Sequence, residues 1–150
     1  MITAQQIKEL RDKTGVSVSA CKRALEEANG DIEKALAVLQ RESVKSAEKK
    51  ADRVLGSGVI EAYVHNNKKV GVIIELKSES DFVSGNEEFR ILAKDIAMHI
   101  AASGPVDVNE LTGQPYIKNT AITVKELLNQ AIQKFGEKIE VSRFAKYNLS

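Results

Sequence analysis

The chain has 150 residues, of which 43% are hydrophobic and 29% charged, as in an ordinary globular protein of one or two small domains. Its net charge of +1 argues against a general nucleic-acid binder, and its apolar runs are too short to cross a bilayer. The single cysteine, Cys21, and an N-terminus without a signal pattern predict a protein of the reducing cytoplasm.

Residues 1–40 carry the pattern of three short helices. Thr3 and Asp31 are candidate N-caps of the first and third helices, and Gly15 and Gly30 stop the first and second. Apolar residues recur at helical spacing within each segment. Because a three-helix unit this small has few large apolar residues, we expect it to pack on something else.

Residues 41–55 are rich in charge and in good helix formers, and neither Gly nor Pro interrupts them. This composition predicts a solvated helical connector rather than a floppy tether. Gly56 and Gly58 then break the helix and open a second domain over residues 56–150.

The second domain begins with two alternating apolar runs, 59–65 and 70–76, on either side of the polar turn 66–69. They predict an antiparallel hairpin. The tail 138–147 also alternates and predicts a third strand. Its phase slips at Arg143–Phe144, which indicates a bulge.

Between these strands, helical spacing predicts one helix that starts near Glu87 and is stopped by Ser103-Gly104-Pro105. It predicts another helix that Thr123 caps, with residues 106–122 as a loop. The fold class is therefore α+β, a small three-stranded antiparallel sheet with helices on one face. Such a sheet has an open face and two edges, so we expect a homodimer. The alternative is a monomer whose N-terminal helices cover the sheet.

A polar loop from Ser78 to Asn86 contains two adjacent apolar residues, Phe82 and Val83. An aromatic side chain on a loop between two rigid elements can serve as a probe for another protein. The alternative is that Phe82 folds back and plugs its own core, as large aromatic side chains usually do. The loop alone leaves both interpretations open.

Motifs for catalysis or cofactor binding are absent. The chain has neither a phosphate-binding P-loop nor a dinucleotide fingerprint, and one cysteine with the distant His65 and His99 makes a zinc site implausible. A small acid–base enzyme that uses Asp81 and His99 is one hypothesis, but a lone carboxylate is weak support for it. We expect a protein that is not an enzyme, needs no cofactor or metal and acts by binding.

Three stretches of the sequence carry recognisable motifs. They are Leu10–Gly15 with Cys21–Leu25 and Asn29–Ala35; Ser80-Asp81-Phe82-Val83; and Gln114–Lys118 with Thr123-Val124 and Gly136–Phe144. Together they resemble the bacterial elongation factor Ts family, and they cover nearly the whole chain in the family's order.

The resemblance implies a translation elongation factor that promotes guanine-nucleotide exchange on elongation factor Tu. In this family the loop similar to Thr-Asp-Phe-Val enters the partner near its Mg²⁺ and phosphates. By this resemblance Asp81 and Phe82 form the wedge, with Ser80 and Val83 completing it. Ser80 stands where the family often has Thr, a change that keeps the hydroxyl.

The resemblance also implies that residues 1–40 form a UBA-like module that docks on the partner's nucleotide domain, with Arg11, Val18 and Ser19 near the contact. Val18 and Ser19 stand where many members carry two methionines, so the contacts there can differ. Longer members carry two related core subdomains, whereas this chain has room for one, and short members act as dimers. A UBA-like adaptor without exchange activity is the alternative function.

Overall fold

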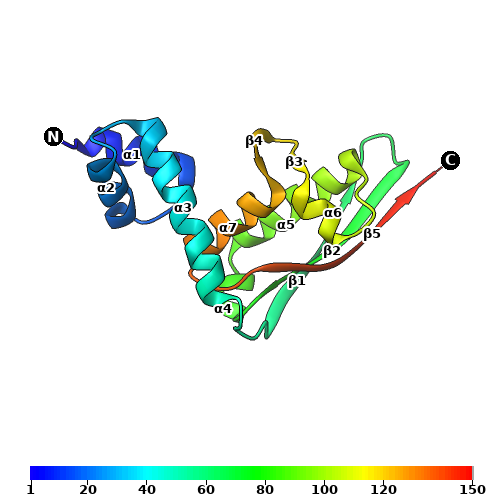
Figure 1. Ribbon diagram of the computed structural model, residues 1–150. Coiled ribbons are helices and arrows are strands. Elements are labelled where there is room, and N and C mark those ends of the chain that lie inside the picture. The colour runs from blue at the N-terminus through cyan, green and yellow to red at the C-terminus, as the bar shows by residue number, and fades with distance from the viewer. Residues whose placement is uncertain (150) are drawn as a thin grey trace. The chain divides into compact units, whose positions relative to one another are not determined.

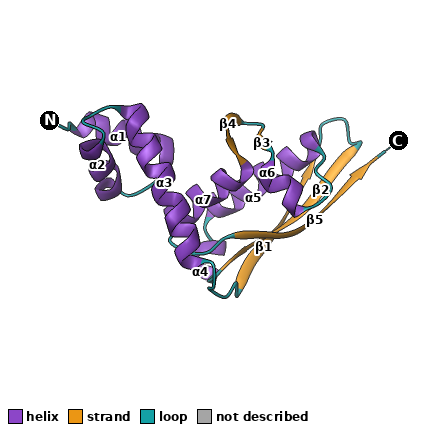
Figure 2. Cartoon of the chain, viewed as in Figure 1, coloured by secondary structure: helices purple, strands orange, loops and turns teal. Residues whose placement is uncertain are grey.

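The computed structural model describes residues 1–149, which form seven helices, a three-stranded sheet and a two-stranded sheet (Figures 1 and 2). The chain divides into two compact units. The first holds Met1–Ala51 together with Asn129–Gly136, and the second holds the rest of the described chain.

The first unit contains the three predicted N-terminal helices, α1 (Ala4–Thr14), α2 (Val18–Glu27) and α3 (Ile32–Lys50). The side chains of Thr3, Ser17 and Asp31 cap them, each accepting a hydrogen bond from the backbone N–H three residues on. α3 continues without a break through residues 41–50, so this part of the expected connector is the end of the third helix.

The core of the first unit combines leucines with small side chains, which let the helices approach closely. Its fully buried members are Leu10, Cys21, Ala24, Leu25 and Ala35. The core is small, as the sequence predicts, and the unit also takes in the distant segment Asn129–Gly136.

The second unit is built on an antiparallel sheet of three strands in the order β1-β2-β5. The strands are β1 (Ser57–Val64), β2 (Val70–Ser78) and β5 (Glu140–Asn148). Glu75 pairs with Arg143, but the next residue, Leu76, pairs with Val141, which leaves Ser142 as an extra residue in β5. The predicted bulge is confirmed, one residue before its expected place.

Helices cover one face of this sheet. The long helix α5 (Glu87–Ser103) packs across β1 and β2, as Figure 1 shows. Val72, Ile74 and Leu76 of β2 are buried on that face, and Phe89 of α5 is fully buried. The predicted α+β class, with helices on one face of a three-stranded antiparallel sheet, is confirmed.

The prediction of a loop over residues 106–122 is wrong. This segment forms α6 (Val108–Gly113) and a two-stranded sheet of β3 (Pro115–Tyr116) and β4 (Asn119–Thr123), followed by α7 (Val124–Phe135). Asp107 caps α6 by accepting the N–H of Glu110, and the N–H of Ile117 donates to His99 of α5. These elements are too short for a periodic signal, and the second contact is long-range.

Candidate functional site

The segment that carries Phe82 is not an open loop but a single helical turn, α4 (Asp81–Ser84), between the end of β2 and the start of α5. Adjacent residues of a helical turn point about 100° apart, so they need not share a face. Phe82 is 87% exposed and Val83 only 4%. The hypothesis that Phe82 plugs its own core is therefore wrong for this structure.

Val83 points into the protein and not into solvent. Its buried side chain anchors the turn from below. Glycine is needed directly after the turn. A Cβ at Gly85 would lie 2.9 Å from the carbonyl oxygen of Asp81, closer than such atoms normally approach.

Hydrogen bonds to the start of β1 hold one side of the turn. The hydroxyl of Ser57 donates to Oδ1 of Asp81 and lies 2.7 Å from Oγ of Ser84. Asp81 is exposed, yet its carboxylate already has a partner in the protein. The hydroxyl of Ser57 thus orients this carboxylate.

A second set of hydrogen bonds ties the residues just before the turn to the start of the C-terminal segment. The backbone N–H and the hydroxyl of Ser80 both donate to the carboxylate of Glu137. The Ser80 hydroxyl, which the family resemblance assigns to the wedge, is thus engaged within the protein. Neither Ser57 nor Glu137 could be found from the sequence, because no local pattern reports contacts between segments so far apart.

In the first unit, the three candidate docking residues lie around one loop. Arg11 is exposed in the last turn of α1, and Val18 is the first residue of α2 with its side chain half exposed. The hydroxyl of Ser19 lies 3.2 Å from that of Ser17, the N-cap of α2. Gly15, with φ of 71°, makes the tight connection that brings the two helix ends together.

His99 is fully buried and both of its ring nitrogens are engaged. Nδ1 accepts the N–H of Ile117 at 3.2 Å, and Nε2 lies 2.9 Å from Oε1 of Gln114. This pattern fits a neutral ring with the proton on Nε2. A histidine in this setting positions the β3–β4 hairpin and is not available as a general base for the Asp81–His99 hypothesis.

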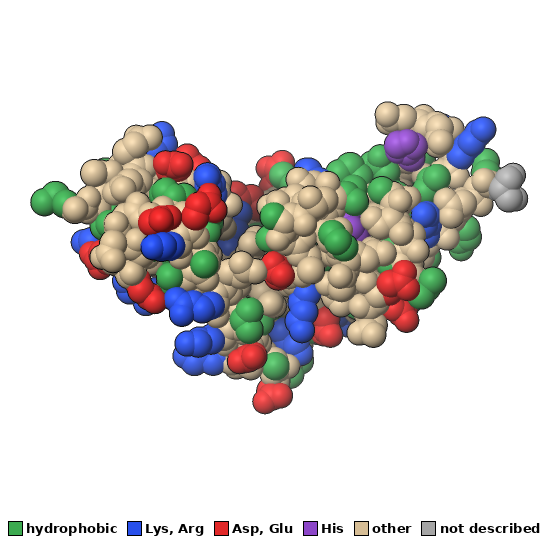
Figure 3. Space-filling model, turned by 45° about the horizontal axis from the view of Figure 1, so that its top comes forward, with side chains coloured by type: hydrophobic (Ala, Val, Ile, Leu, Met, Phe, Trp, Pro, Cys, Tyr) green, Lys and Arg blue, Asp and Glu red, His purple; other side chains and the backbone are tan. Residues whose placement is uncertain are grey.

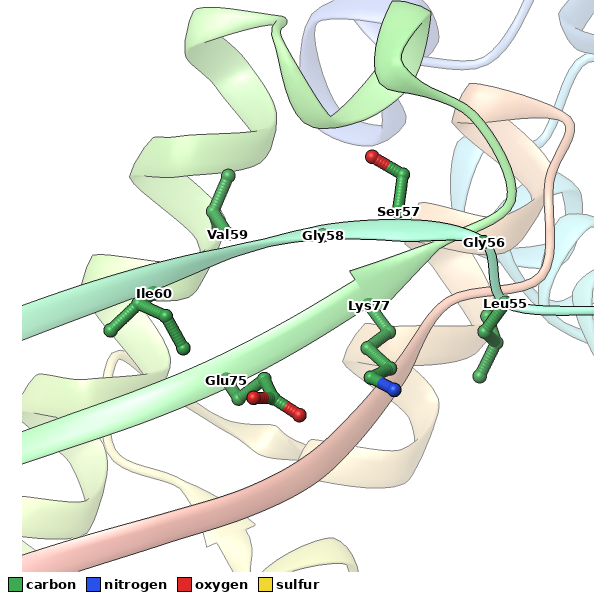
Figure 4. A pocket seen from close by; sticks show the side chains of 8 residues that line it. All are labelled: Leu55, Gly56, Ser57, Gly58, Val59, Ile60, Glu75 and Lys77. Carbon is green, nitrogen blue, oxygen red and sulfur yellow. The ribbon is translucent and has the colours of Figure 1, made fainter.

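A shallow pocket opens beside the first residues of β1 (Figure 4). In this view Ile60, Glu75 and Lys77 point to one side of the sheet, and Ser57 and Val59 to the other. The hydrogen bond from Ser142, together with Arg143, holds the pKa of Glu75 below its ordinary value. A carboxylate kept ionised in this way suits a structural ion pair better than a proton-transferring group.

The face of the sheet away from α5 is open and partly apolar. The register places Ile60, Val64, Ile73 and Tyr147 on this face, and each of these side chains is at least half exposed. Glu75 and Arg143 form an ion pair among them, with 3.2 Å between N and O. We call these residues the open sheet face.

The next features are surface charge, groups that could hold a metal ion and the character of the helices. Figure 3 shows acidic and basic side chains interspersed on the face that it displays. Within residues 1–149 no cluster of three or more His, Cys, Asp or Glu side chains is placed to hold a metal ion. None of the helices in this part of the chain combines the length and apolar character of a membrane span.

Comparison with known proteins gives the family. A family model described as Elongation factor TS matches residues 3–110 and 79–150. The elongation factor Ts of Carboxydothermus hydrogenoformans is 40% identical over 194 aligned positions, covering 99% of this chain and 89% of the relative. That of Thermosipho melanesiensis is 38% identical, with 99% of each chain covered. The chain belongs to the elongation factor Ts family.

Family membership makes this chain a translation elongation factor. The alignments run over 194 positions, more than the 150 residues present here, so these elongation factor Ts relatives carry segments that this chain lacks. Residues 79–110, which include α4 and α5, are matched twice. The family model thus contains two segments similar to this part of the chain.

Proposed function

We propose that this chain is a guanine-nucleotide exchange factor that binds GDP-bound elongation factor Tu and promotes GDP release. The observation that carries the proposal is the exposed Phe82 on α4, held by hydrogen bonds and by the buried Val83. An isolated exposed aromatic on a braced turn is the form expected of a group that enters a partner.

The proposed mechanism depends on the chemistry of Mg²⁺ and phosphate. Mg²⁺ demands near-ideal octahedral geometry, so a small displacement of its surroundings weakens its binding sharply. The metal neutralises phosphate charge, so its loss weakens GDP binding as well. Phe82 and Asp81 act as the wedge, Val83 anchors it from below, and GTP rebinds once GDP has left.

One aromatic side chain can supply enough binding free energy for the proposed exchange. A buried interface hot spot contributes about 2–4 kcal/mol, or roughly 30- to 1,000-fold in affinity. By linkage, bound GDP lowers the affinity of elongation factor Tu for this protein by the same factor by which this protein lowers its affinity for GDP. The exchange factor is therefore released again when nucleotide rebinds.

The first unit supplies a second contact in this proposal, through Arg11, Val18 and Ser19 around the α1–α2 loop. The protein acts by binding and is not itself an enzyme, needs no cofactor and makes no direct contact with nucleic acid. It works in the cytoplasm, where translation elongation takes place.

We also propose that the protein is a homodimer through the open sheet face. Isologous dimers join the same patch of both subunits, so the patch must be self-complementary. Apolar side chains and the oppositely charged Glu75 and Arg143 lie together on this face, which meets that condition. Ile73→Glu should shift the mass measured by sedimentation equilibrium to that of a monomer. Ile91→Glu, at an equally exposed position on α5, should not.

The exchange proposal is tested by release of a fluorescent GDP analogue from elongation factor Tu at fixed Mg²⁺. Acceleration at substoichiometric concentration supports it, and Phe82→Ala should lower the rate about 30-fold or more. Val106→Ala, at an equally exposed apolar position of the same unit, is the matched control and should keep the full rate. If the folded protein gives no acceleration but still binds a partner, the UBA-like adaptor is the better interpretation.

A further inference from the structure

A single carboxylate braces the chain just before the exposed turn. Oε1 of Glu137 accepts the backbone N–H groups of Glu79 at 3.1 Å and Ser80 at 3.0 Å, and Oε2 accepts the hydroxyl of Ser80. Three donors from two consecutive residues therefore converge on one side chain. This is the arrangement by which a carboxylate fixes a backbone segment.

The brace is reciprocal. Oε2 of Glu79 accepts the backbone N–H of Lys138, the residue after Glu137, and forms an ion pair with Arg53 at 3.4 Å. Each segment therefore offers a carboxylate to the backbone of the other. We call the residue pair Glu79 and Glu137 the carboxylate clamp.

The clamp holds the start of the turn α4, where a local cap is missing. Ser80 is the N-cap residue, but its side chain makes no capping hydrogen bond. Its hydroxyl donates to Glu137 instead. A cap normally fixes how a helix begins. Here the residue that opens the turn is held by a side chain 57 residues away in the sequence, while Ser57 holds the other side of the turn.

Gly136 lets the carboxylate reach this position. It ends α7 with φ of 74°, in the left-handed region that favours glycine, and Glu137 follows directly. The nearby Glu140 also belongs to the C-terminal segment but is exposed and lies in β5. It offers a matched control with the same chemistry.

We propose that Glu137 is the positioning residue for the Asp81–Phe82 wedge, acting through the carboxylate clamp. The inference rests on the proposed exchange function for its effect on rate, but its structural part can be tested separately. Glu137 touches neither nucleotide nor metal in this proposal. It holds Phe82 in the direction that the partner meets.

The structural test is hydrogen exchange of single amides, measured by NMR on the full chain. Glu137→Ala should speed exchange at Glu79 and Ser80 by about tenfold or more, since charged hydrogen bonds of this kind are the strong ones. Glu137→Gln should increase these exchange rates less, because the amide oxygen of glutamine can still accept the hydrogen bonds. Glu140→Ala should leave both amides unchanged.

The functional test is a double-mutant cycle in the GDP-release assay. Glu137→Ala should lower the saturating release rate about tenfold, with a smaller change in the half-saturating concentration. In a Phe82→Ala background, Glu137→Ala should lower the saturating release rate less than twofold, because the side chain that Glu137 positions is gone. Glu137→Gln serves for both tests if the alanine variant fails to fold.

The outcomes separate the two proposals. If wild-type protein does not accelerate GDP release, the exchange function fails, while the amide measurements still decide the clamp. Unchanged exchange at Glu79 and Ser80 in the Glu137 variants would overturn the clamp. Full additivity with Phe82→Ala would overturn the positioning role.

Discussion

Phe82 and Phe89 lie seven residues apart and allow one substitution to be compared in opposite surroundings. Phe82 is 87% exposed on α4, whereas Phe89 is fully buried in α5. Replacing each by alanine removes the same atoms. The difference in stability between the two variants should therefore report burial alone.

The expected magnitudes differ widely. Truncating a fully buried phenylalanine costs about 3–5 kcal/mol of unfolding free energy. Only about an eighth of Phe82 is buried, so the same change there should cost roughly 0.5 kcal/mol or less. At about 2–4 °C per kcal/mol, the melting temperature should fall by roughly 6–20 °C for Phe89→Ala and by about 2 °C or less for Phe82→Ala.

Equilibrium unfolding in urea, followed by circular dichroism, measures both variants against wild type. In the GDP-release assay, Phe82→Ala should lose activity although it keeps its stability. A loss above about 1.5 kcal/mol for Phe82→Ala would refute the reasoning, because the side chain would then belong to the core of the fold.

Three further predictions concern the single residues Gly58, Tyr116 and His99. Gly58→Ala should destabilise the β1–β2 pair by about 1–3 kcal/mol in urea unfolding, because its Cβ would lie 2.6 Å from the carbonyl oxygen of Leu76; wild-type stability would contradict this. Burial raises the pKa of Tyr116 to about 12, so the folded state keeps a proton that the unfolded state loses near pH 10. The unfolding free energy should thus fall by about 1–3 kcal/mol between about pH 10 and 12, and by less in Tyr116→Phe. His99→Leu leaves the N–H of Ile117 without its acceptor and should speed hydrogen exchange at that amide, whereas an unchanged rate would show that the bond is not formed in solution.

Features set by neighbouring residues could be predicted from the sequence. Thr3, Asp31 and Thr123 are found as helix caps, because a cap depends on a side chain and an amide three residues away. The hairpin, the closing strand and its bulge follow from alternation and from a break in it. These signals are strong wherever an element is long enough to repeat.

Other features depend on contacts between distant segments. The sequence could place Phe82 and Val83 side by side, but only the helical turn decides which of them is buried. The brace on that turn joins Ser80 to Glu137, 57 residues away in the chain. Likewise, β3 and β4 are short strands whose place depends on the buried His99. No periodicity within a window reports such contacts.

The return of the chain through α7 has a consequence for dissection. Its residues from Asn129 onward cluster with Met1–Ala51, while its first turn belongs to the other unit. A cut after Ala51 would therefore sever the backbone without detaching a self-contained fragment. Deleting the first 51 residues would remove most of the unit with which Asn129–Gly136 clusters. Truncations should therefore be designed around three backbone crossings between the units rather than one.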